Sequence, residues 1–326
     1  MHVKWYFKPL LILWLLSLSY IKMATDGSID FHHLLPPHCK QLVSSWLRED
    51  IPGFDYAGVV VGDRPEEAVL LCKSPGVLCG VPFFDMIFTE LGCVVEWSHP
   101  EGSYLEPVCE VARVRGPANK LLQGERTALN VLHRASGIAT HARDLCNEVQ
   151  RLGWKGEVAG TRKTTPGFRI VEKYALLVGG ISTHRYDLSQ MVMLKDNHIW
   201  AAGSVALAVG RARKVGGFSI KIEVECRSVA EAEEAVKAGA DIVMLDNFEP
   251  AALAQASRAL KASFPALTIE ASGGIRKETL SQYCLPSVDV VSLSSTTQGY
   301  KTTNFSLKLC KEGHDPRNPT VTVDNI

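Results

Sequence analysis

Short apolar runs alternate with amphipathic segments along the second half of the chain, from about residue 157 onward. Runs that alternate with helical segments are typical of repeated β/α units and predict a parallel sheet. Between two of these runs, Ser228 and Glu231 carry a capping-box signature, Val229, Ala232 and Val236 form an apolar face, and Gly239 ends the predicted helix. The strands that we predict are Glu157–Ala159, Met191–Leu194, Ser219–Ile222, Asp241–Leu245, Leu267–Ile269 and Val288–Val291.

This β/α region is too short for a closed eightfold barrel. Such a barrel takes about 250 residues, whereas about 170 separate Arg126 from the C-terminal segment. We therefore expect an incomplete β/α barrel over residues 126–296. An open doubly wound sheet is the alternative, but the first strand lacks the Gly-x-Gly-x-x-Gly that a dinucleotide-binding version requires.

The first half of the chain has a different pattern. From about His32 to Arg115, short strands and helices mix with Pro and Gly turn signals, which predicts an α+β domain over residues 23–125. Between Asn119 and Arg151 the period becomes helical, and Gly137 divides the stretch, so we expect a pair of linking helices. Residues 297–326 should return towards the N-terminal domain and end in a frayed tail.

The N-terminus carries a hydrophobic segment that resembles a signal peptide. Lys4 and Lys8 precede an uncharged stretch from Pro9 to Ile21, which is shorter than the roughly 20 residues that span a bilayer. Met23 follows directly, and a polar sequence comes after it. We expect residues 1–22 to be an extension, signal-like or untranslated, ahead of an enzyme that starts near Met23.

Composition and charge narrow the classes of partner and the compartment. Hydrophobic residues make up 46% of the 326, which is enough for folded domains, and 35 basic residues balance 35 acidic ones. This balance argues against nucleic-acid or membrane partners, because no global field attracts the protein to either. The nine cysteines form no Cys-x-x-Cys pair, so we expect reduced thiols in a cytoplasmic protein.

Charged and small polar residues follow nearly every predicted strand. The carboxyl ends of barrel strands converge on one mouth, and charged residues are rarely buried without partners, so the set as a whole indicates a functional site. For any one member, a surface ion pair is an equally good explanation. The members are Arg162 and Lys163, Lys195 to His198, Glu225, Asp246 with Asn247, and Ser272 to Gly274; His184 and Arg185 precede the second strand.

The chemistry of these side chains suits a small ligand that carries several negative charges. Arginine matches a carboxylate with two parallel hydrogen bonds, and lysine acts as a point charge. Glu225 and Asp246 could hold Mg²⁺ through substrate phosphates, accept from sugar hydroxyls, or balance the lysines. A Ser-Gly-Gly turn after a strand offers backbone N–H groups to a phosphate, although such a turn can also be purely structural.

Several motifs in order resemble the quinolinate phosphoribosyltransferase family (nicotinate-nucleotide diphosphorylase, carboxylating). The resemblance runs from about Leu34 to Leu309. The motifs are Gly124–Asn130, Ala159–Gly167, Glu172–Tyr174, Gly179–Gly180, His184–Arg185, Lys195–His198, Glu223–Glu225, Leu245–Asn247 and Glu270–Gly274.

The resemblance implies transfer of phosphoribosyl from phosphoribosyl pyrophosphate to quinolinate with loss of CO₂, giving nicotinate mononucleotide for NAD biosynthesis. It also implies Mg²⁺, a dimer unit within a hexamer, and Arg126 supplied by the neighbouring subunit. Catalysis would involve Lys163, Lys195, Glu225 and Asp246, of which Glu225 and Asp246 would meet the metal, directly or through water. Quinolinate would meet Arg126, Arg162, Lys163, His184, Arg185 and Lys195, and phosphoribosyl would meet Glu225, Asp246, Ser272, Gly273, Gly274 and Ser294.

One position departs from the family pattern. The family has glycine where this chain has Ser294, so we expect weaker phosphate binding if the backbone there needs a positive φ. Two other functions stay open at this point. Nicotinate phosphoribosyltransferase has a substrate with a single carboxylate, which the surplus of cations disfavours, and a non-catalytic relative would bind a phosphorylated metabolite without turning it over.

Overall fold

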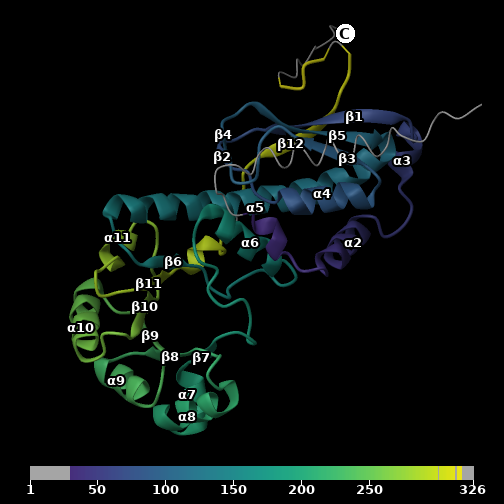
Figure 1. Ribbon diagram of the computed structural model, residues 1–326. Coiled ribbons are helices and arrows are strands. Elements are labelled where there is room, and N and C mark those ends of the chain that lie inside the picture. The colour runs from purple at the N-terminus through teal and green to yellow at the C-terminus, as the bar shows by residue number, and fades with distance from the viewer. Residues whose placement is uncertain (1–29, 300, 313, 318–326) are drawn as a thin grey trace, which may run out of the picture.

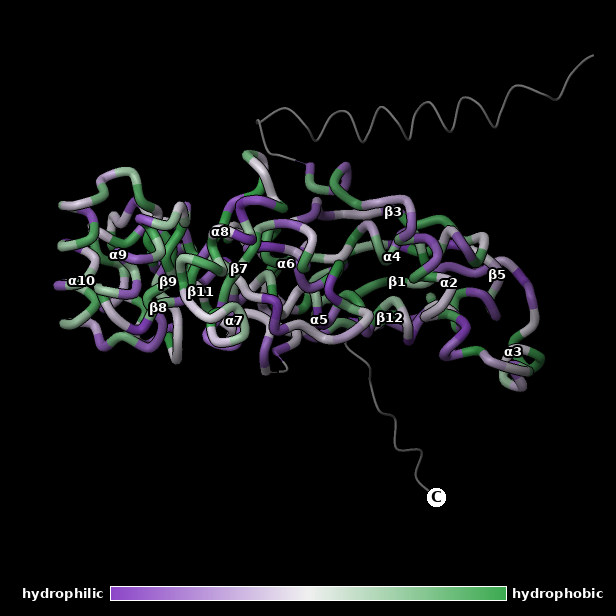
Figure 2. Tube along the Cα trace, turned by 90° about the horizontal axis from the view of Figure 1, so that it is seen from below, coloured by the Kyte–Doolittle hydropathy of each residue, from purple (hydrophilic) through white to green (hydrophobic). Residues whose placement is uncertain are grey.

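The computed structural model describes residues 30–299, 301–312 and 314–317. The predicted extension at residues 1–22 and the end of the tail lie outside this range. The described chain forms an elongated molecule in which an N-terminal part and a β/α part lie end to end, joined by one long helix (Figure 1). In both parts, hydrophobic and hydrophilic residues alternate along the trace (Figure 2).

The N-terminal part is an α+β domain built on a four-stranded antiparallel sheet in the order β12-β1-β5-β3. The C-terminal strand β12 (Phe305–Leu309) is therefore hydrogen-bonded to β1, which lies early in the chain. Buried side chains of β1, such as Leu70, share one core with Phe83 and Phe84 of α4. The other elements here are η1 (Phe31–Leu34), α2 (Cys39–Asp50), α3 (Tyr56–Val61), β1 (Pro65–Cys72), β2 (Gly76–Val77), α4 (Val81–Glu90), β3 (Val94–Trp97), β4 (Tyr104–Leu105) and β5 (Cys109–Pro117).

The predicted pair of linking helices is wrong, because residues 118–152 form one continuous helix of 35 residues, α5 (Ala118–Leu152). Gly137 lies inside this helix and is buried. A Cβ atom at Gly137 would lie 2.1 Å from the carbonyl oxygen of Lys301 and 2.7 Å from Cα of Thr302. The glycine therefore marks a close crossing of two backbones, which a local sequence pattern does not distinguish from a helix break.

Replacing Gly137 by alanine should destabilise the protein. Alanine gains up to about 1 kcal/mol in helix propensity, but overpacking against a backbone typically costs about 1–3 kcal/mol. Gly210 in α8 (Val205–Gly216) is a matched control, because nothing lies within 4 Å of a Cβ built there. Urea denaturation should show a lower midpoint for Gly137→Ala and an unchanged or higher one for Gly210→Ala. Equal midpoints would contradict this explanation.

The β/α part contains six parallel strands in the order β6-β11-β10-β9-β8-β7. The sheet curves, helices cover its outer side, and it does not close into a barrel (Figure 1). This confirms the predicted incomplete barrel. The elements are β6 (Glu157–Ala159), α6 (Arg169–Gly179), β7 (Val192–Leu194), α7 (Asp196–Ala202), α8, β8 (Ile222–Cys226), α9 (Val229–Lys237), β9 (Ile242–Asp246), α10 (Pro250–Ser263), β10 (Thr268–Ser272), α11 (Leu280–Tyr283), β11 (Val290–Ser292) and η2 (Ser294–Thr296).

The predicted bounds of the third strand were wrong. The run Ser219–Ile222 overlaps β8 only at Ile222, and the strand continues to Cys226. Glu223 is fully buried in this strand and Glu225 is partly buried. These two acidic residues interrupt the apolar run. The apolar pattern therefore ends at Ile222, which is the first residue of the strand.

The helix predicted after this strand is α9. The Oγ atom of Ser228 accepts a hydrogen bond from the backbone N–H of Glu231, as a capping residue should. The Glu231 carboxylate accepts from the N–H of Arg227. Ala232 is buried, and Val229 and Val236 pack against the core from partly buried positions.

Among the described residues, no helix combines the length and the apolar composition needed to cross a membrane.

Candidate active site

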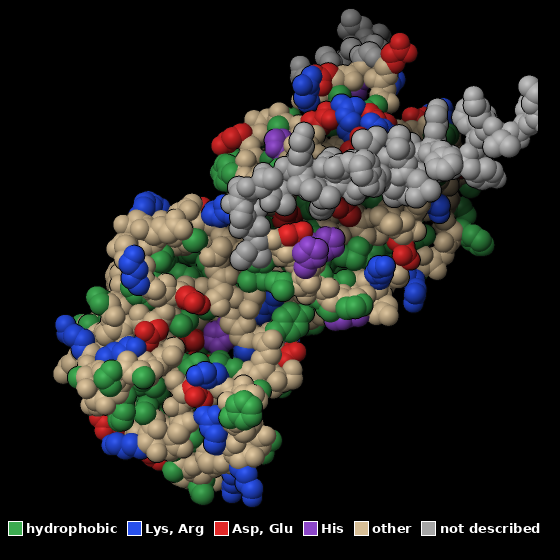
Figure 3. Space-filling model, viewed as in Figure 1, with side chains coloured by type: hydrophobic (Ala, Val, Ile, Leu, Met, Phe, Trp, Pro, Cys, Tyr) green, Lys and Arg blue, Asp and Glu red, His purple; other side chains and the backbone are tan. Residues whose placement is uncertain are grey.

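Four of the predicted site residues meet at the carboxyl ends of the parallel strands. The Lys195 ammonium donates to the Glu225 carboxylate. Asp246 ends β9 and lies in the field of Glu225, Lys195 and Lys163. Burial, and then the Glu225 charge, raise the pKa of Asp246, and both lysines partly offset this effect. Lys, Arg and His side chains gather at the recess over this sheet (Figure 3).

The loop after β6 carries Arg162 and Lys163, and buried groups hold it in place. The Glu172 carboxylate accepts from the backbone N–H of Thr165 at 3.0 Å and from its hydroxyl at 2.9 Å. Glu172 also forms a buried ion pair with Arg134 at 3.1 Å. The Thr297 hydroxyl donates to the carbonyl of Lys163 at 2.8 Å. The loop is thus fixed from α5, α6 and the segment after η2, which lie far apart in the sequence.

Arg162 and Arg185 form the cationic side of the site. The Nε atom of Arg162 is buried and has no hydrogen-bond partner within the described chain. Burial, and then the nearby Arg162 charge, lower the pKa of Arg185. Two neighbouring guanidinium groups repel each other, and a buried donor without an acceptor is costly, so the pair suits an anion that brings its own oxygen atoms.

His184 lies beside this pair, but both of its ring nitrogens are engaged within the protein. Nδ1 accepts from the backbone N–H of Arg185 at 2.7 Å, so Nε2 carries the proton that it donates to Glu270 at 3.0 Å. The side chain is only 8% exposed. His184 therefore reaches the predicted site, but in this arrangement it has no ring nitrogen left for a ligand.

The predicted phosphate loop follows β10 and touches the end of β9. Gly273 has φ +95°, and a Cβ there would lie 2.6 Å from the backbone nitrogen of Asn247. Glycine is needed at this position for both reasons. Ser272 ends β10, and its hydroxyl accepts from Ser292 at the end of β11 at 2.9 Å. Gly274 has φ +65° and open space where a side chain would be.

Ser294 does not need the backbone freedom of glycine. It begins η2, and among the described non-glycine residues only His184 and Asn247 have positive φ. The backbone strain that a positive φ would impose on Ser294 is therefore absent. The hydroxyl of the neighbouring Ser295 is buried and has no hydrogen-bond partner in the described chain.

Arg126 is the predicted site residue that comes from the long helix α5. It is exposed on α5, on the side of His133, whose ring stacks on Phe305 of β12. Within the described residues, Arg126 forms no ion pair with the cluster.

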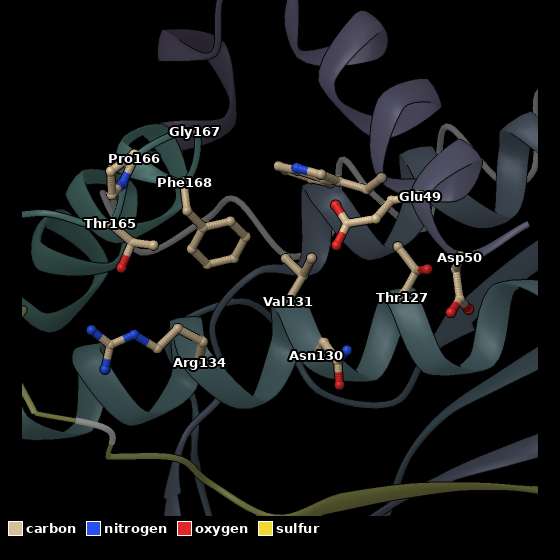
Figure 4. A pocket seen from close by; sticks show the side chains of 11 residues that line it. Glu49, Asp50, Thr127, Asn130, Val131, Arg134, Thr165, Pro166, Gly167 and Phe168 are labelled. Carbon is tan, nitrogen blue, oxygen red and sulfur yellow. The ribbon is translucent and has the colours of Figure 1, made fainter. Parts of the chain in front are cut away.

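A pocket lies beside the β6 loop, and Arg134, Thr165 and Phe168 are among the residues that line it. Its volume is about 470 Å³, and it separates α2 and α5 from the loop at Thr165 to Phe168. Figure 4 shows Glu49, Arg134 and Phe168 around it. Neither Arg162 nor Lys163 lines this pocket, so we place the chemistry at the strand ends, where the charges converge.

Buried charged residues that support the site received no role from the sequence. The signal for them is a charged residue inside an otherwise apolar segment, as at Glu172 and Lys173 in α6. Lys173 is only 2% exposed, and its ammonium donates to the carbonyls of Thr183 and Arg185. Burial, and then three nearby arginines, lower its pKa to about 8. In the part of the chain that the structure describes, these residues are Arg134, Glu172, Lys173, Glu223 and Glu270.

Comparison with known proteins agrees with this geometry. The chain is 56% identical over 284 residues to the nicotinate-nucleotide pyrophosphorylase [carboxylating] of Rattus norvegicus, covering 87% of this chain and 95% of the relative. It is 57% identical to the Homo sapiens protein of that name, covering 85% and 93%. A solved nicotinate-nucleotide pyrophosphorylase from Francisella tularensis superposes with a TM-score of 0.79 at 29% identity, covering 87% of this chain and 100% of that one.

Two family domains account for most of the chain. Residues 55–136 match "Quinolinate phosphoribosyl transferase, N-terminal domain", and residues 138–308 match the C-terminal domain of the same enzyme. The chain covers the two mammalian relatives almost completely, and the two family domains follow each other in the expected order. Both findings agree with the cluster of charged side chains at the strand ends. The chain therefore belongs to the quinolinate phosphoribosyltransferase family.

Proposed function

We propose that this protein transfers phosphoribosyl from phosphoribosyl pyrophosphate to quinolinate with decarboxylation, giving nicotinate mononucleotide, pyrophosphate and CO₂. The observation that carries the proposal is the convergence of two kinds of group at one mouth. Arg162 and Arg185 provide a cationic surface for a dicarboxylate, and Lys163, Lys195, Glu225 and Asp246 surround the adjacent strand ends.

In the first step, the C1–O bond to pyrophosphate breaks while the pyridine nitrogen bonds to C1 of the ribose. The ammonium groups of Lys163 and Lys195 stabilise the negative charge that develops on the leaving oxygen. Glu225 holds the Lys195 ammonium in place. Arg162 and Arg185 orient the ring by its carboxylates, so that much of the rate enhancement comes from positioning.

In the second step, the new pyridinium ring accepts electron density from the carboxylate next to its nitrogen. The bond between C2 and this carboxylate breaks, CO₂ leaves, and the electron pair on C2 takes up one proton. Arg162 and Arg185 would keep the ring in the same place through both steps. The pyridine ring therefore needs no second binding site for the decarboxylation step.

We propose Mg²⁺ as the metal, bound near Glu225 and Asp246. Two carboxylates lie close enough for Glu225 to raise the pKa of Asp246, and such oxygen donors suit Mg²⁺ held mainly by substrate phosphates. When bound, the ion would neutralise charge on the pyrophosphate. Chelation by EDTA should lower turnover at least about tenfold, and added Mg²⁺ should restore it. Full activity in excess chelator would contradict a metal requirement.

We propose that Ser272, Gly273, Gly274 and Ser294 receive the 5-phosphate of the ribose. Because Ser294 is not strained, its hydroxyl can donate to the phosphate without a backbone cost. Ser294→Gly should then raise KM for phosphoribosyl pyrophosphate about two- to tenfold, the value of one hydrogen bond of about 0.5–1.5 kcal/mol. Ser294→Ala is the control, because it removes the hydroxyl and keeps the backbone restricted. A fall in this KM for Ser294→Gly would show that glycine is the better residue here.

We also propose a homo-oligomer, with a dimer unit and a hexamer as the full assembly, in which Arg126 completes the neighbouring site. Arg126 is exposed on α5, and within the described chain it forms no ion pair with the cluster. Apolar side chains that a partner could cover are exposed on and beside α3. They are Phe54, Tyr56, Val59 and Val60, all more than 80% exposed.

A direct assay tests the proposed reaction. The purified protein is incubated with quinolinate, phosphoribosyl pyrophosphate and Mg²⁺, and both pyrophosphate and CO₂ are measured. Equal amounts of the two products are expected. Pyrophosphate without CO₂ when nicotinate replaces quinolinate would favour nicotinate phosphoribosyltransferase, and neither product with either acid would favour a non-catalytic relative.

The structural likeness to the human nicotinic acid phosphoribosyltransferase does not favour that alternative. At 15% identity and a TM-score of 0.52, it reflects a shared fold alone.

For the compartment, we propose the cytoplasm, because all nine cysteines are free thiols. Entry of the tagged full-length chain into the secretory pathway would contradict this.

A further inference from the structure

A buried cluster below the strand ends takes no part in the steps above. His184, Glu223 and Glu270 place ligand-type atoms within 4.8 Å of one another. Glu223 follows the first residue of β8, and Glu270 lies in the middle of β10. They precede Glu225 and Ser272 by two residues each, and alternate residues of a strand face the same side. The acidic pair therefore lies one layer beneath the mouth.

The hydrogen bonds of this cluster do not fit a metal site. The ring nitrogen of His184 nearest the carboxylates is Nε2, which carries a proton because Nδ1 accepts from Arg185. A protonated nitrogen cannot bind a metal ion. Two cations also act on the pair from outside it: the Arg185 charge acts on both glutamates, and the Lys195 charge acts on Glu223.

A proton shared between the two carboxyls would give a hydrogen bond to two of their three oxygens that lack partners. Both oxygens of Glu223 and Oε1 of Glu270 are buried without a hydrogen bond in the described chain. Burial, and then the Glu270 carboxyl, raise the pKa of Glu223, and Arg185 partly offsets this. One proton held between the two carboxyls leaves a single negative charge beneath the guanidinium of Arg185.

The cluster connects directly to the backbone of Arg185. Glu270 accepts from His184, and His184 accepts from the N–H of Arg185, while His184 itself holds φ at 57°. A positive φ at a residue other than glycine costs energy, so surrounding contacts must hold it. Lys173 binds the carbonyls on both sides of His184, and the Arg185 guanidinium donates to the carbonyl of Met191 at 3.3 Å.

We propose that Glu270, with Glu223 as its buried partner, is a positioning residue that acts through His184 to fix Arg185 where it receives one carboxylate of quinolinate. This inference rests on the proposed function. It assigns the pair to recognition of the dicarboxylate, and the phosphoribosyl side of the site stays independent of it.

Substitution of Glu270 tests this role by its effect on the two substrates. Glu270→Leu should raise KM for quinolinate on the order of tenfold and change KM for phosphoribosyl pyrophosphate less than about twofold. Glu270→Gln keeps an oxygen that can accept from His184, so it should recover most of the loss. Asp85→Leu is the matched control, because Asp85 is a partly buried carboxylate that accepts a hydrogen bond from Trp97 in the N-terminal part. It should lower stability without a selective change in either KM.

A double-mutant cycle with Arg185 separates positioning from general stability. In the Arg185→Ala background, Glu270→Leu should change KM for quinolinate less than about twofold, because its effect passes through Arg185. If Glu270→Leu does not fold, His184→Asn replaces it: asparagine tolerates positive φ but is too short to reach Glu270. The same selective rise in KM is expected.

Three results would overturn the inference: an unchanged KM for quinolinate, equal rises for both substrates, or an additive cycle. The proposed function is judged separately, on the wild-type protein. If the wild type forms neither pyrophosphate nor CO₂, the proposed function fails whatever the variants do. If it forms both and the cycle is additive, only the role of Glu270 is wrong.

Discussion

Arg162→Lys should lower kcat/KM for quinolinate about 30- to 1,000-fold, which corresponds to about 2–4 kcal/mol of lost transition-state binding. The Nε atom of Arg162 is buried without a partner, so the guanidinium is set to bind a ligand with more than one of its nitrogens. Lysine keeps the charge but offers a single point of contact, and its shorter head group leaves the carboxylate partly unbound. Steady-state kinetics at saturating phosphoribosyl pyrophosphate measure the loss.

The control for this prediction is Arg143→Lys. Arg143 donates to the carbonyls of Gly179 and Val178, away from the charged cluster, so the same chemical change should leave kcat/KM within about threefold of wild type. Near-full kcat/KM in Arg162→Lys would mean that Arg162 does not clamp a carboxylate. Equal losses in both variants would point to destabilisation of α6 and its loop.

Mixing two inactive variants, Arg126→Ala and Lys163→Ala, should restore activity. If Arg126 acts in the neighbour's site, a hybrid dimer contains one site with both residues intact and one site with neither. Random exchange makes half of the dimers hybrid, so about a quarter of all sites should be active. Each variant alone should lose at least about a hundredfold in kcat/KM, because each removes a charge that meets the substrates.

Lys163 is a good partner for this experiment because its removal should leave the loop intact. Its side chain is exposed, and Thr297 and Glu172 hold the loop through backbone groups and Thr165. Subunits are exchanged by unfolding and refolding the mixture. Each variant is taken through the same steps alone and assayed, which corrects for any activity that refolding restores without exchange. Differently tagged subunits show whether exchange took place. No recovery in a mixture with verified hybrids would place Arg126 in the site of its own chain or outside any site.

The local pattern of the sequence determined the general architecture and most of the site. Strand and helix periods predicted six β/α strands, and β6, β7 and β9 lie within one residue of their predicted bounds. The chain length predicted a barrel that does not close. Because the carboxyl ends of parallel strands meet at one edge of the sheet, the sequence alone predicts that Lys163, Lys195, Glu225 and Asp246 converge.

Only the tertiary structure decided the features that depend on residues far apart in the chain. Gly137 lies inside the continuous helix α5 at the point where the backbone of Lys301 crosses it, and the sequence does not show this crossing. The bounds predicted for β8 were also wrong, because buried Glu223 interrupts the apolar run. The sequence could not reveal that both ring nitrogens of His184 bond within the protein, to the backbone N–H of Arg185 and to the Glu270 carboxylate. Period and composition report on neighbours along the chain, whereas hydrogen bonds, charge pairing and close packing join segments that only folding brings into contact.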